Sequence, residues 1–321
     1  GARNTAIGQE ALASQNFTSA TDSYNTAVGM NAGRLVTTGI ENTLIGGLAG
    51  DALTDADYNV AVGVYALSAD SKGSKSVAIG RAALAAQNFT SSTDSFNTAV
   101  GYHAGVVLTS GVSNTLLGGL AGDAITTGSN NVALGRSALT ANTTASDNTA
   151  VGMASLAANT TGTLNTAVGR DALTLNTTGI DNVAVGAKAL DANTTANGNT
   201  AIGGYALTAN TTGALNVAVG WAALYDNTTG ADNTAVGRSA LGNNTTAADN
   251  VAVGSNALYT NTTGTANVSI GTSSMYANTT ASNNTAVGAS ALNANTTGTF
   301  NTAFGKGAGS AITTGGSNVC I

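Results

Sequence analysis

A five-residue motif, Asn-Thr/Val-Ala-Val/Ile-Gly, recurs along the whole chain and limits its possible folds more than any other feature. Its glycine stands at positions 8, 29, 46, 63, 80, 101, 118 and 135, and then every 17 residues to Gly305. A nineteenth copy begins at Asn318. Two steps are 21 residues long, and both carry the same insertion, Gln15–Thr18 and Gln87–Thr90. Because one such unit is too short to bury a core alone, we predict a stack in which each unit covers the next.

The repeats run through the chain without a linker or a change of composition, which predicts a single repeat domain over residues 1–321. Residues 4–75 and 76–147 are tandem copies of a 72-residue block, each with one 21-residue unit, and residues 148–321 are uninterrupted 17-residue repeats. We expect the two long units to bulge outward at Asn16–Ser23 and Asn88–Ser95.

Side chains alternate inside the motif with the period of a β-strand. Thr or Val stands three positions before the glycine and Val, Ile, Leu or Phe one position before it, so these two share a face. Between them stands Ala in fifteen of nineteen copies, the exceptions being Leu44, Leu116, Ser269 and Cys320. Both faces are apolar, which predicts a strand covered on both sides. With a second short extended piece per unit, the predicted fold is an all-β solenoid, or parallel β-roll, of about nineteen 17-residue coils.

Two further columns support stacking. Asn begins the motif in eighteen of nineteen copies, Ser76 being the exception, and stacked Asn side chains form hydrogen-bonded amide ladders. The glycine after the strand predicts a positive φ or a close backbone approach.

One apolar side chain per unit is retained while its position moves. Leu stands four residues after the glycine in twelve units, and Met275 in one. Five units have Gly there instead, and only those five have an apolar residue three positions later: Val36, Leu53, Leu108, Ile125 and Ile312. Each coil is therefore expected to fill one fixed pocket.

Composition excludes several functions. With 10 Lys and Arg, a net charge of −6 and 8% charged residues, the chain lacks the basic stripe that nucleic acid needs. One His and one Cys argue against a metal centre and an intrachain disulfide. No apolar run reaches the 18 or so residues of a membrane span.

The start, Gly1-Ala2-Arg3, predicts a mature product or a fragment. We expect no cofactor and no enzymatic activity, because near-identical coils offer no pocket of convergent titratable groups.

The few chemically distinctive residues are expected to be structural. His103 follows Gly101-Tyr102 and is expected to be an exposed loop histidine, and Cys320 a small buried residue rather than an interchain cross-link. Asp55-x-Asp57-x-Asn59 resembles the start of a calcium loop but lacks its glycine and distal Glu, so calcium is not expected there.

Several rows of similar residues recur at fixed positions in the unit. We interpret Asp147, Asp181, Asp232 and Asp249 as solvated turn carboxylates, and the cations after the glycine as a solvated corner row: Arg81, Arg136, Arg170, Arg238 and Lys306. Trp221 and Tyr102 stand at the same position in their own coils. An aromatic side chain exposed there can stack on a sugar, contact another chain or lie at the edge of the core.

A pair of Thr residues, with Ser110 as the one deviation, recurs in thirteen consecutive coils from Thr109-Ser110 to Thr313-Thr314. Turn chemistry and hydroxyl ladders explain it. The sequence Asn-Thr-Thr, as at Asn142 and Asn159, is also a glycosylation sequon.

The motifs Asn4-Thr5-Ala6-Ile7-Gly8 and Ser76-Val77-Ala78-Ile79-Gly80-Arg81-Ala82-Ala83 resemble the head repeat of trimeric autotransporter adhesins. The resemblance covers about eight residues of each of the eighteen complete units. It implies a left-handed parallel β-roll, three chains wide, at the outer tip of bacterial surface fibres. Phage tail fibres carry similar repeats.

These observations predict an extracellular, rigid structural or adhesive fibre segment that forms a parallel homotrimer and binds a host cell-surface, matrix or glycan receptor. A monomeric solenoid is the alternative assembly, and a phage tail-fibre shaft or receptor-binding segment is the alternative function; flanking sequence would separate cell-surface from virion origin. Ice binding by a Thr column is a third class. Adjacent Thr residues point to opposite faces, however, unlike a Thr-x-Thr array, and Thr177, Thr194 and Thr211 are the positions at which to test it.

Overall fold

A computed structural model describes residues 3–321 of the chain, which divides into two compact units, Gly1–Thr163 and Leu164–Ile321. Both units are parallel β-solenoids, and the described residues contain no helix. Nine strands of the first unit and ten of the second mark about nineteen coils in residues 3–321. The solenoid prediction is confirmed.

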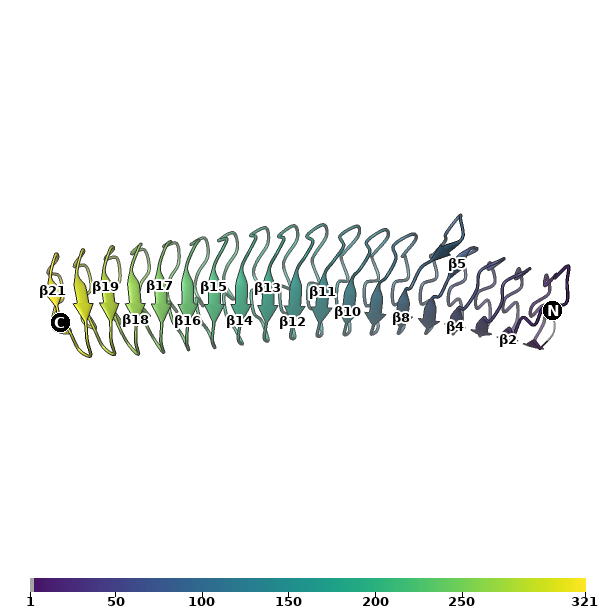
Figure 1. Cartoon of the computed structure of the whole chain (residues 1–321), viewed down its shortest axis with the longest axis horizontal. Helices are drawn as coiled ribbons and strands as arrows, with labels where there is room; N and C mark the ends of the chain where they lie inside the picture. Colours follow the sequence, from purple (N-terminus) through teal and green to yellow (C-terminus); the bar gives the residue numbers. More distant parts are fainter. Residues whose placement is uncertain (1–2) are drawn as a thin grey trace. The chain divides into compact units, whose positions relative to one another are not determined.

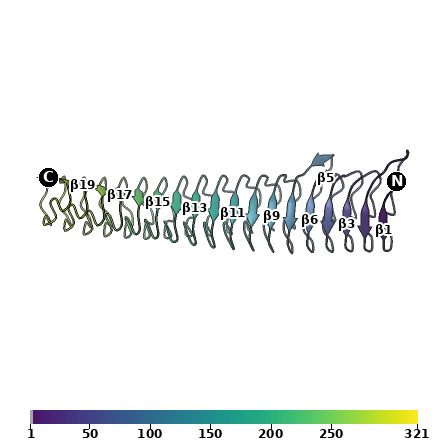
Figure 2. The same cartoon turned by 60° about the horizontal axis from the view of Figure 1, so that its bottom comes forward.

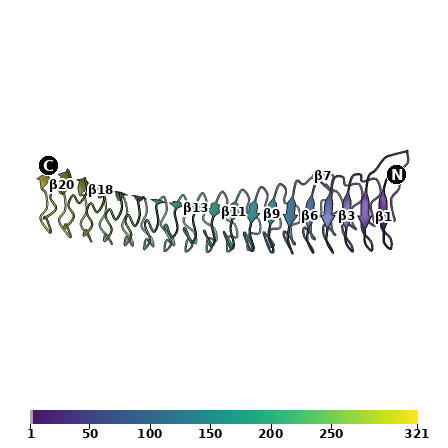
Figure 3. The same cartoon turned by 90° about the horizontal axis from the view of Figure 1, so that it is seen from below.

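In the first unit each motif forms a three-residue strand, and neighbouring strands pair in parallel with the repeats in register, as Ala6 does with Ala27. Figure 3 shows several of these strands as a row of parallel arrows. The strands are β1 (Thr5–Ile7), β2 (Thr26–Val28), β3 (Thr43–Ile45), β4 (Val60–Val62), β6 (Val77–Ile79), β8 (Thr98–Val100), β9 (Thr115–Leu117), β10 (Val132–Leu134) and β11 (Thr149–Val151).

The second unit repeats this arrangement without insertions, and its strands follow one another in chain order (Figure 1). Ala184 pairs with Ala201, and Ala201 with Ala218. The strands are β12 (Thr166–Val168), β13 (Val183–Val185), β14 (Thr200–Ile202), β15 (Val217–Val219), β16 (Thr234–Val236), β17 (Val251–Val253), β18 (Val268–Ile270), β19 (Thr285–Val287), β20 (Thr302–Phe304) and β21 (Val319–Cys320).

The expected second extended piece is wrong for nearly every coil. Among residues 3–321 only β5 (Gly73–Ser74) and β7 (Thr93–Asp94) form a second, two-stranded sheet. Elsewhere the rest of the coil consists of turns, because residues at fixed positions have left-handed φ values; Asp171, for example, has φ of 57° and Leu173 of 50°. Such residues reverse the chain and prevent an extended segment.

The expected outward bulges at Asn16–Ser23 and Asn88–Ser95 are confirmed in part, because Ser23, Phe89 and Ser95 are buried. β5 stands away from the row of strands in Figure 2, where the second long unit pairs with it through β7. Phe89 is buried against Gly73, whereas Thr90, Ser91 and Ser92 are exposed. In the first long unit Asn16 and residues 18–20 are exposed.

The glycine that ends each strand is needed for two reasons. Gly186 has φ of 138°, a region that side chains rarely permit. A Cβ there would also lie 2.6 Å from the carbonyl carbon and oxygen of Gly203 in the next coil. Both expected roles of this glycine, the positive φ and the close approach, are confirmed.

Two columns of buried Asn run along the coils. In the first column the Asn182 N–H donates to Asn165 Oδ1 at 3.1 Å, and Asn182 Nδ2 donates to the same oxygen at 3.1 Å and to the Ala196 carbonyl at 2.8 Å. A second column lies seven residues after the glycine, where Asn193 Nδ2 donates to Asn176 Oδ1 at 2.8 Å. The amide ladder is confirmed and is double in the coils that carry Asn-Thr-Thr.

The first ladder passes through Ser76 by means of the insertion. Ser76 Oγ lies 2.6 Å from Ser95 Oγ and accepts a bond from Gln87 Nε2 at 2.8 Å, while Asn97 Nδ2 donates to Gln87 Oε1 at 2.9 Å. The buried Asp70 carboxylate also accepts from Gln87, at 2.6 Å. The insertion therefore replaces the amide bonds that a motif Asn would make.

The core of each coil lies inside the single chain. From β2 onward the strand Ala side chains are fully buried, as is the apolar residue four positions after the glycine; Ala184 and Leu190 illustrate this, both with 0% exposure, whereas Ala6 in the first coil is exposed. Chains of a homotrimer therefore do not share a core through the Ala face, because each coil closes on that face itself. The other sheet face, however, is not covered by the chain: Ile202 is 41% exposed. The strand is covered on one side rather than on both.

Candidate functional site: an aromatic groove on the second unit

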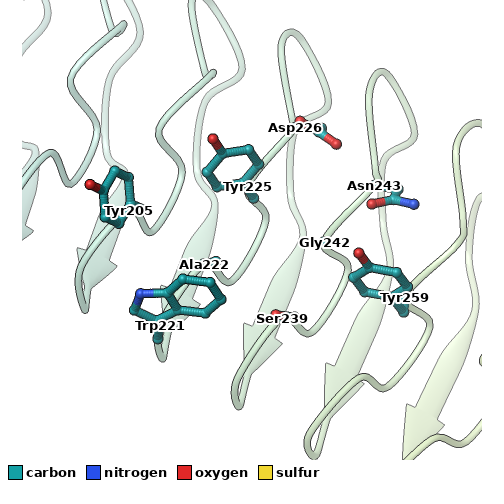
Figure 4. A pocket seen from close by; sticks show the side chains of 9 residues that line it. All are labelled: Tyr205, Trp221, Ala222, Tyr225, Asp226, Ser239, Gly242, Asn243 and Tyr259. Atoms are coloured by element: carbon teal, nitrogen blue, oxygen red, sulfur yellow. The ribbon is translucent and has the colours of Figure 1, made fainter.

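A groove with a cavity volume of about 570 Å³ lies on the surface of the second unit (Figure 4). We call it the aromatic groove and define it by its lining residues: Tyr205, Trp221, Ala222, Tyr225, Asp226, Ser239, Gly242, Asn243 and Tyr259. These residues come from the turns that follow strands β14, β15, β16 and β17. The tight turns hold the side chains at corners of the coils, where they project from the backbone.

The aromatic side chains cluster at one end of the groove. The Tyr205 ring lies 6.5 Å from the Trp221 ring at an interplanar angle of 69°, and 6.5 Å from the Tyr225 ring at 48°. Trp221 remains 56% exposed and Tyr225 41% exposed. Large aromatic faces are therefore accessible to a ligand.

Tyr259 forms the opposite wall of the groove, and its ring lies against Gly242. Tyr225, Gly242 and Tyr259 stand at the same position, five residues after the motif glycine, in three successive coils. A Cβ on Gly242 would lie 2.7 Å from Tyr259 Cε2, so the tyrosine ring leans over the glycine. Behind Tyr259 the Tyr276 ring stacks at 5.4 Å and 16°.

Polar groups line the rest of the groove. The half-buried Asp226 and Asn243 lie on successive coils, and Ser239 Oγ lies between the aromatic walls (Figure 4). Within residues 3–321 no hydrogen bond or ion pair takes up the side chain of Asp226 or of Asn243. No lining residue is a cation.

Of the residues singled out from the sequence, only Trp221 lies in this groove. Tyr102, at the same position of a coil in the first unit, stacks on His103 with a centroid distance of 3.9 Å. His103 lies in a turn, as expected, but it is half-exposed rather than exposed because the Tyr102 ring covers it; its Nε2 lies 2.9 Å from Arg81 Nη1. The other groove residues were not predicted from the sequence. Their signal is the 17-residue spacing of Tyr225, Gly242, Tyr259 and Tyr276, which places them at the same position of four successive coils.

The predicted corner rows are confirmed. The corner cations and the Asp residues before the motif Asn are all exposed. The four Asp residues also have left-handed φ values, from 57° at Asp232 to 62° at Asp249, which Asp tolerates in turns. Cys320 is half-buried with a free thiol, beside Gly309.

The structure uses Asp55, Asp57 and Asn59 separately. Asp57 Oδ1 accepts from the Ile40 N–H at 2.8 Å, Asp55 Oδ1 from Thr54 Oγ1 at 3.0 Å, and Asn59 is part of the buried amide ladder. Burial raises the pKa of the Asp57 carboxyl, and the bond from Ile40 offsets only part of that effect. Within residues 3–321 no three His, Cys, Asp or Glu side chains form a group that could hold a metal ion.

The first Thr of each pair forms the expected hydroxyl ladder, whereas the second, such as Thr178, is exposed. Thr177 Oγ1 donates to the Thr194 carbonyl at 3.0 Å and Thr194 Oγ1 to the Thr211 carbonyl at 3.2 Å. The sequon reading of Asn142 and Asn159 is not supported by the fold, because both amides are fully buried and hydrogen-bonded.

The described residues contain no helix long and apolar enough to cross a membrane. The sequence matches no protein-family model, and no curated protein matches it either.

Proposed function

We propose that the chain is a segment of an extracellular fibre with a structural and adhesive role, and that it assembles as a parallel homotrimer. The observation that carries this proposal is the uncovered face of the sheet in each unit. There, two columns of side chains repeat on every coil, Thr or Val in one and Val, Ile, Leu or Phe in the other. Neither column contains a charged residue.

The uncovered, uncharged sheet face favours the binding of a partner that would cover it. Ile7, Ile202 and Phe304 are 60%, 41% and 63% exposed, although they belong to strands. Soluble monomers rarely expose large continuous apolar patches, and such patches mark interaction surfaces. A second copy of the chain fits well, because its face has the same side chains at the same 17-residue interval. The resemblance of the motif to trimeric adhesin heads supports three copies.

Adhesion is supported by repetition. The motif and the Thr pairs recur on successive coils and so offer many copies of any weak contact, and linked weak contacts give an avidity well above that of one site. A stiff stack also suits a spacer that holds a binding surface away from a cell.

The adhesive role is tested with the full chain coupled to beads, which are presented to host cells, to matrix proteins and to immobilised glycans. We expect retention on at least one of these surfaces, relative to beads that carry the same mass of albumin. Absence of retention on all three would reject the adhesive role.

A further inference from the structure

We infer that the aromatic groove binds a neutral hexopyranose residue of a glycan. This inference deepens the proposed function, on which it rests for its biological setting, by naming the receptor class and the residues that contact it.

The aromatic faces match the apolar side of a sugar ring. A pyranose presents a face of C–H groups, which packs against an aromatic ring, while its hydroxyls lie around the edge. Trp221 and Tyr225 offer such rings with 56% and 41% exposure. Aromatic side chains that also carry a polar tip are suited to ligands of this mixed character.

The coil spacing leaves room for a sugar ring between Tyr225 and Tyr259. Two coils that are two steps apart are separated by about 9.6 Å at the strand spacing of a sheet. A flat ring between two others at van der Waals contact needs about 8 Å. The Tyr259 ring leans toward Gly242, on which a Cβ would lie 2.7 Å from Tyr259 Cε2, so this ring forms one wall of the space.

The polar groups of the groove match sugar hydroxyls. The Asp226 carboxylate accepts hydrogen bonds, and the Asn243 amide both donates and accepts them. Neither side chain has a partner among residues 3–321, so both are available to a ligand. With an acidic group and no cation in the lining, the groove favours a neutral sugar over a phosphate, a nucleotide or an acidic sugar.

The aromatic residues are not required by the coil. Apart from Tyr276, which stacks on Tyr259, other coils of the second unit have small or polar residues five positions after the motif glycine and form the same turns, for example Thr174, Asp191, Thr208 and Asn293. The fold of the coil therefore does not require Tyr225 or Tyr259. Their placement on either side of Gly242 needs a different explanation, which ligand binding provides.

Trp221 is the only tryptophan of the chain, so intrinsic fluorescence reports directly on the groove. The full chain is titrated with the methyl α- and β-glycosides of glucose, galactose and mannose. We expect a saturable change in emission with at least one glycoside, with a Kd of about 1 mM. In Gly242→Thr, which retains Trp221, the new side chain collides with the Tyr259 ring and displaces this wall of the groove, and the Kd rises at least about tenfold.

Tyr102→Ala is the matched control, since it removes an aromatic residue from the equivalent corner of a coil outside the groove; its Kd should equal that of the unaltered chain. No saturable change with any glycoside, or equal affinity in Gly242→Thr, would overturn the inference. The bead assay separates the two proposals: adhesion without glycoside binding rejects the groove alone, and glycoside binding without adhesion rejects the adhesive role alone.

Discussion

Asn199 shows how one buried residue connects three coils. Its N–H donates to Asn182 Oδ1 at 3.0 Å, its Nδ2 to the Gly213 carbonyl at 2.9 Å, and its Oδ1 accepts from the Asn216 N–H at 2.9 Å. A buried polar group that loses its partner costs about 1–3 kcal/mol. The column of motif Asn residues therefore contributes stability at every coil.

Asn199→Ala should lower the free energy of unfolding by about 2 kcal/mol, because the buried Asn216 N–H loses its partner, while the Gly213 carbonyl keeps the bond from Asn210 Nδ2. Urea denaturation followed by circular dichroism measures the change. Asn243→Ala, at a half-buried position without a side-chain partner among the described residues, is the control and should shift stability by less than about 0.5 kcal/mol. Equal effects of the two substitutions would contradict the ladder's role.

Asp57 makes stability depend on pH in the opposite direction to most carboxylates. Burial raises its pKa above the usual 3.8, so the folded state takes up this proton before the unfolded state as the pH falls. Its contribution is most favourable below the unfolded pKa and is lost as the pH rises through the folded pKa. Asp57→Asn keeps an acceptor for the Ile40 N–H but removes the charge. We expect its Tm to exceed that of the unaltered chain at pH 7 and the difference to shrink toward pH 4; a difference that is constant over this range would refute the assignment.

At the scale of the coil, one core pocket is filled in alternative ways. In most coils it is filled by a Leu with left-handed φ, such as Leu67 at 52°, although this conformation costs a non-glycine residue about 1–2 kcal/mol. Around β3 the pocket is filled from the strand instead. A Cβ on Gly50 would lie 2.7 Å from Leu44 Cδ2 and 2.8 Å from Leu53 Cδ1, so these two side chains occupy the space of the usual Leu.

This exchange predicts compensation between substitutions. Leu44→Ala should cost about 3 kcal/mol through the cavity that it leaves. Gly50→Leu alone should also destabilise, because the new side chain collides with Leu44 and Leu53. The triple variant Leu44→Ala, Gly50→Leu, Leu53→Asn has the residue pattern of the ordinary coils and should be more stable than Gly50→Leu. A triple variant less stable than that single variant would mean that the pocket is not shared; thermal unfolding provides the comparison.

At the scale of the whole molecule, assembly depends on the uncovered sheet face. Ile202→Lys with Val219→Lys places charges in the outward column of β14 and β15 without touching the core, since Ala201 and Ala218 point inward. We expect the unaltered chain to have three times its mass of 31.0 kDa in light scattering and this variant to have the mass of one chain.

Thr178→Lys with Thr195→Lys is the matched control for the assembly test. Both residues are exposed in the turn half of their coils, outside the sheet, so the assembly should persist in this variant. A single-chain mass for the unaltered protein would reject the trimer, and dissociation by both variants would show that added charge rather than the sheet face is responsible.

The sequence by itself determined the coil length, the position of each strand, the ladder of motif Asn residues and the glycine that ends each strand. These features repeat at a fixed interval, and only stacking in register satisfies them all in every coil. The pattern of Leu and Gly even predicted a pocket filled from different positions.

Only the tertiary structure decided which apolar face of the strand is buried within its own coil, and which residues of different coils lie next to one another. Alternation along a strand shows that two faces are apolar, but it does not show which face the chain itself covers. The turn residues with left-handed φ decide this, because they fold Leu190 and its equivalents onto the Ala column. The aromatic groove could not be predicted from the sequence for a similar reason. Trp221 and Tyr259 are 38 positions apart in the sequence, and only stacking of successive coils places them around one space above Gly242.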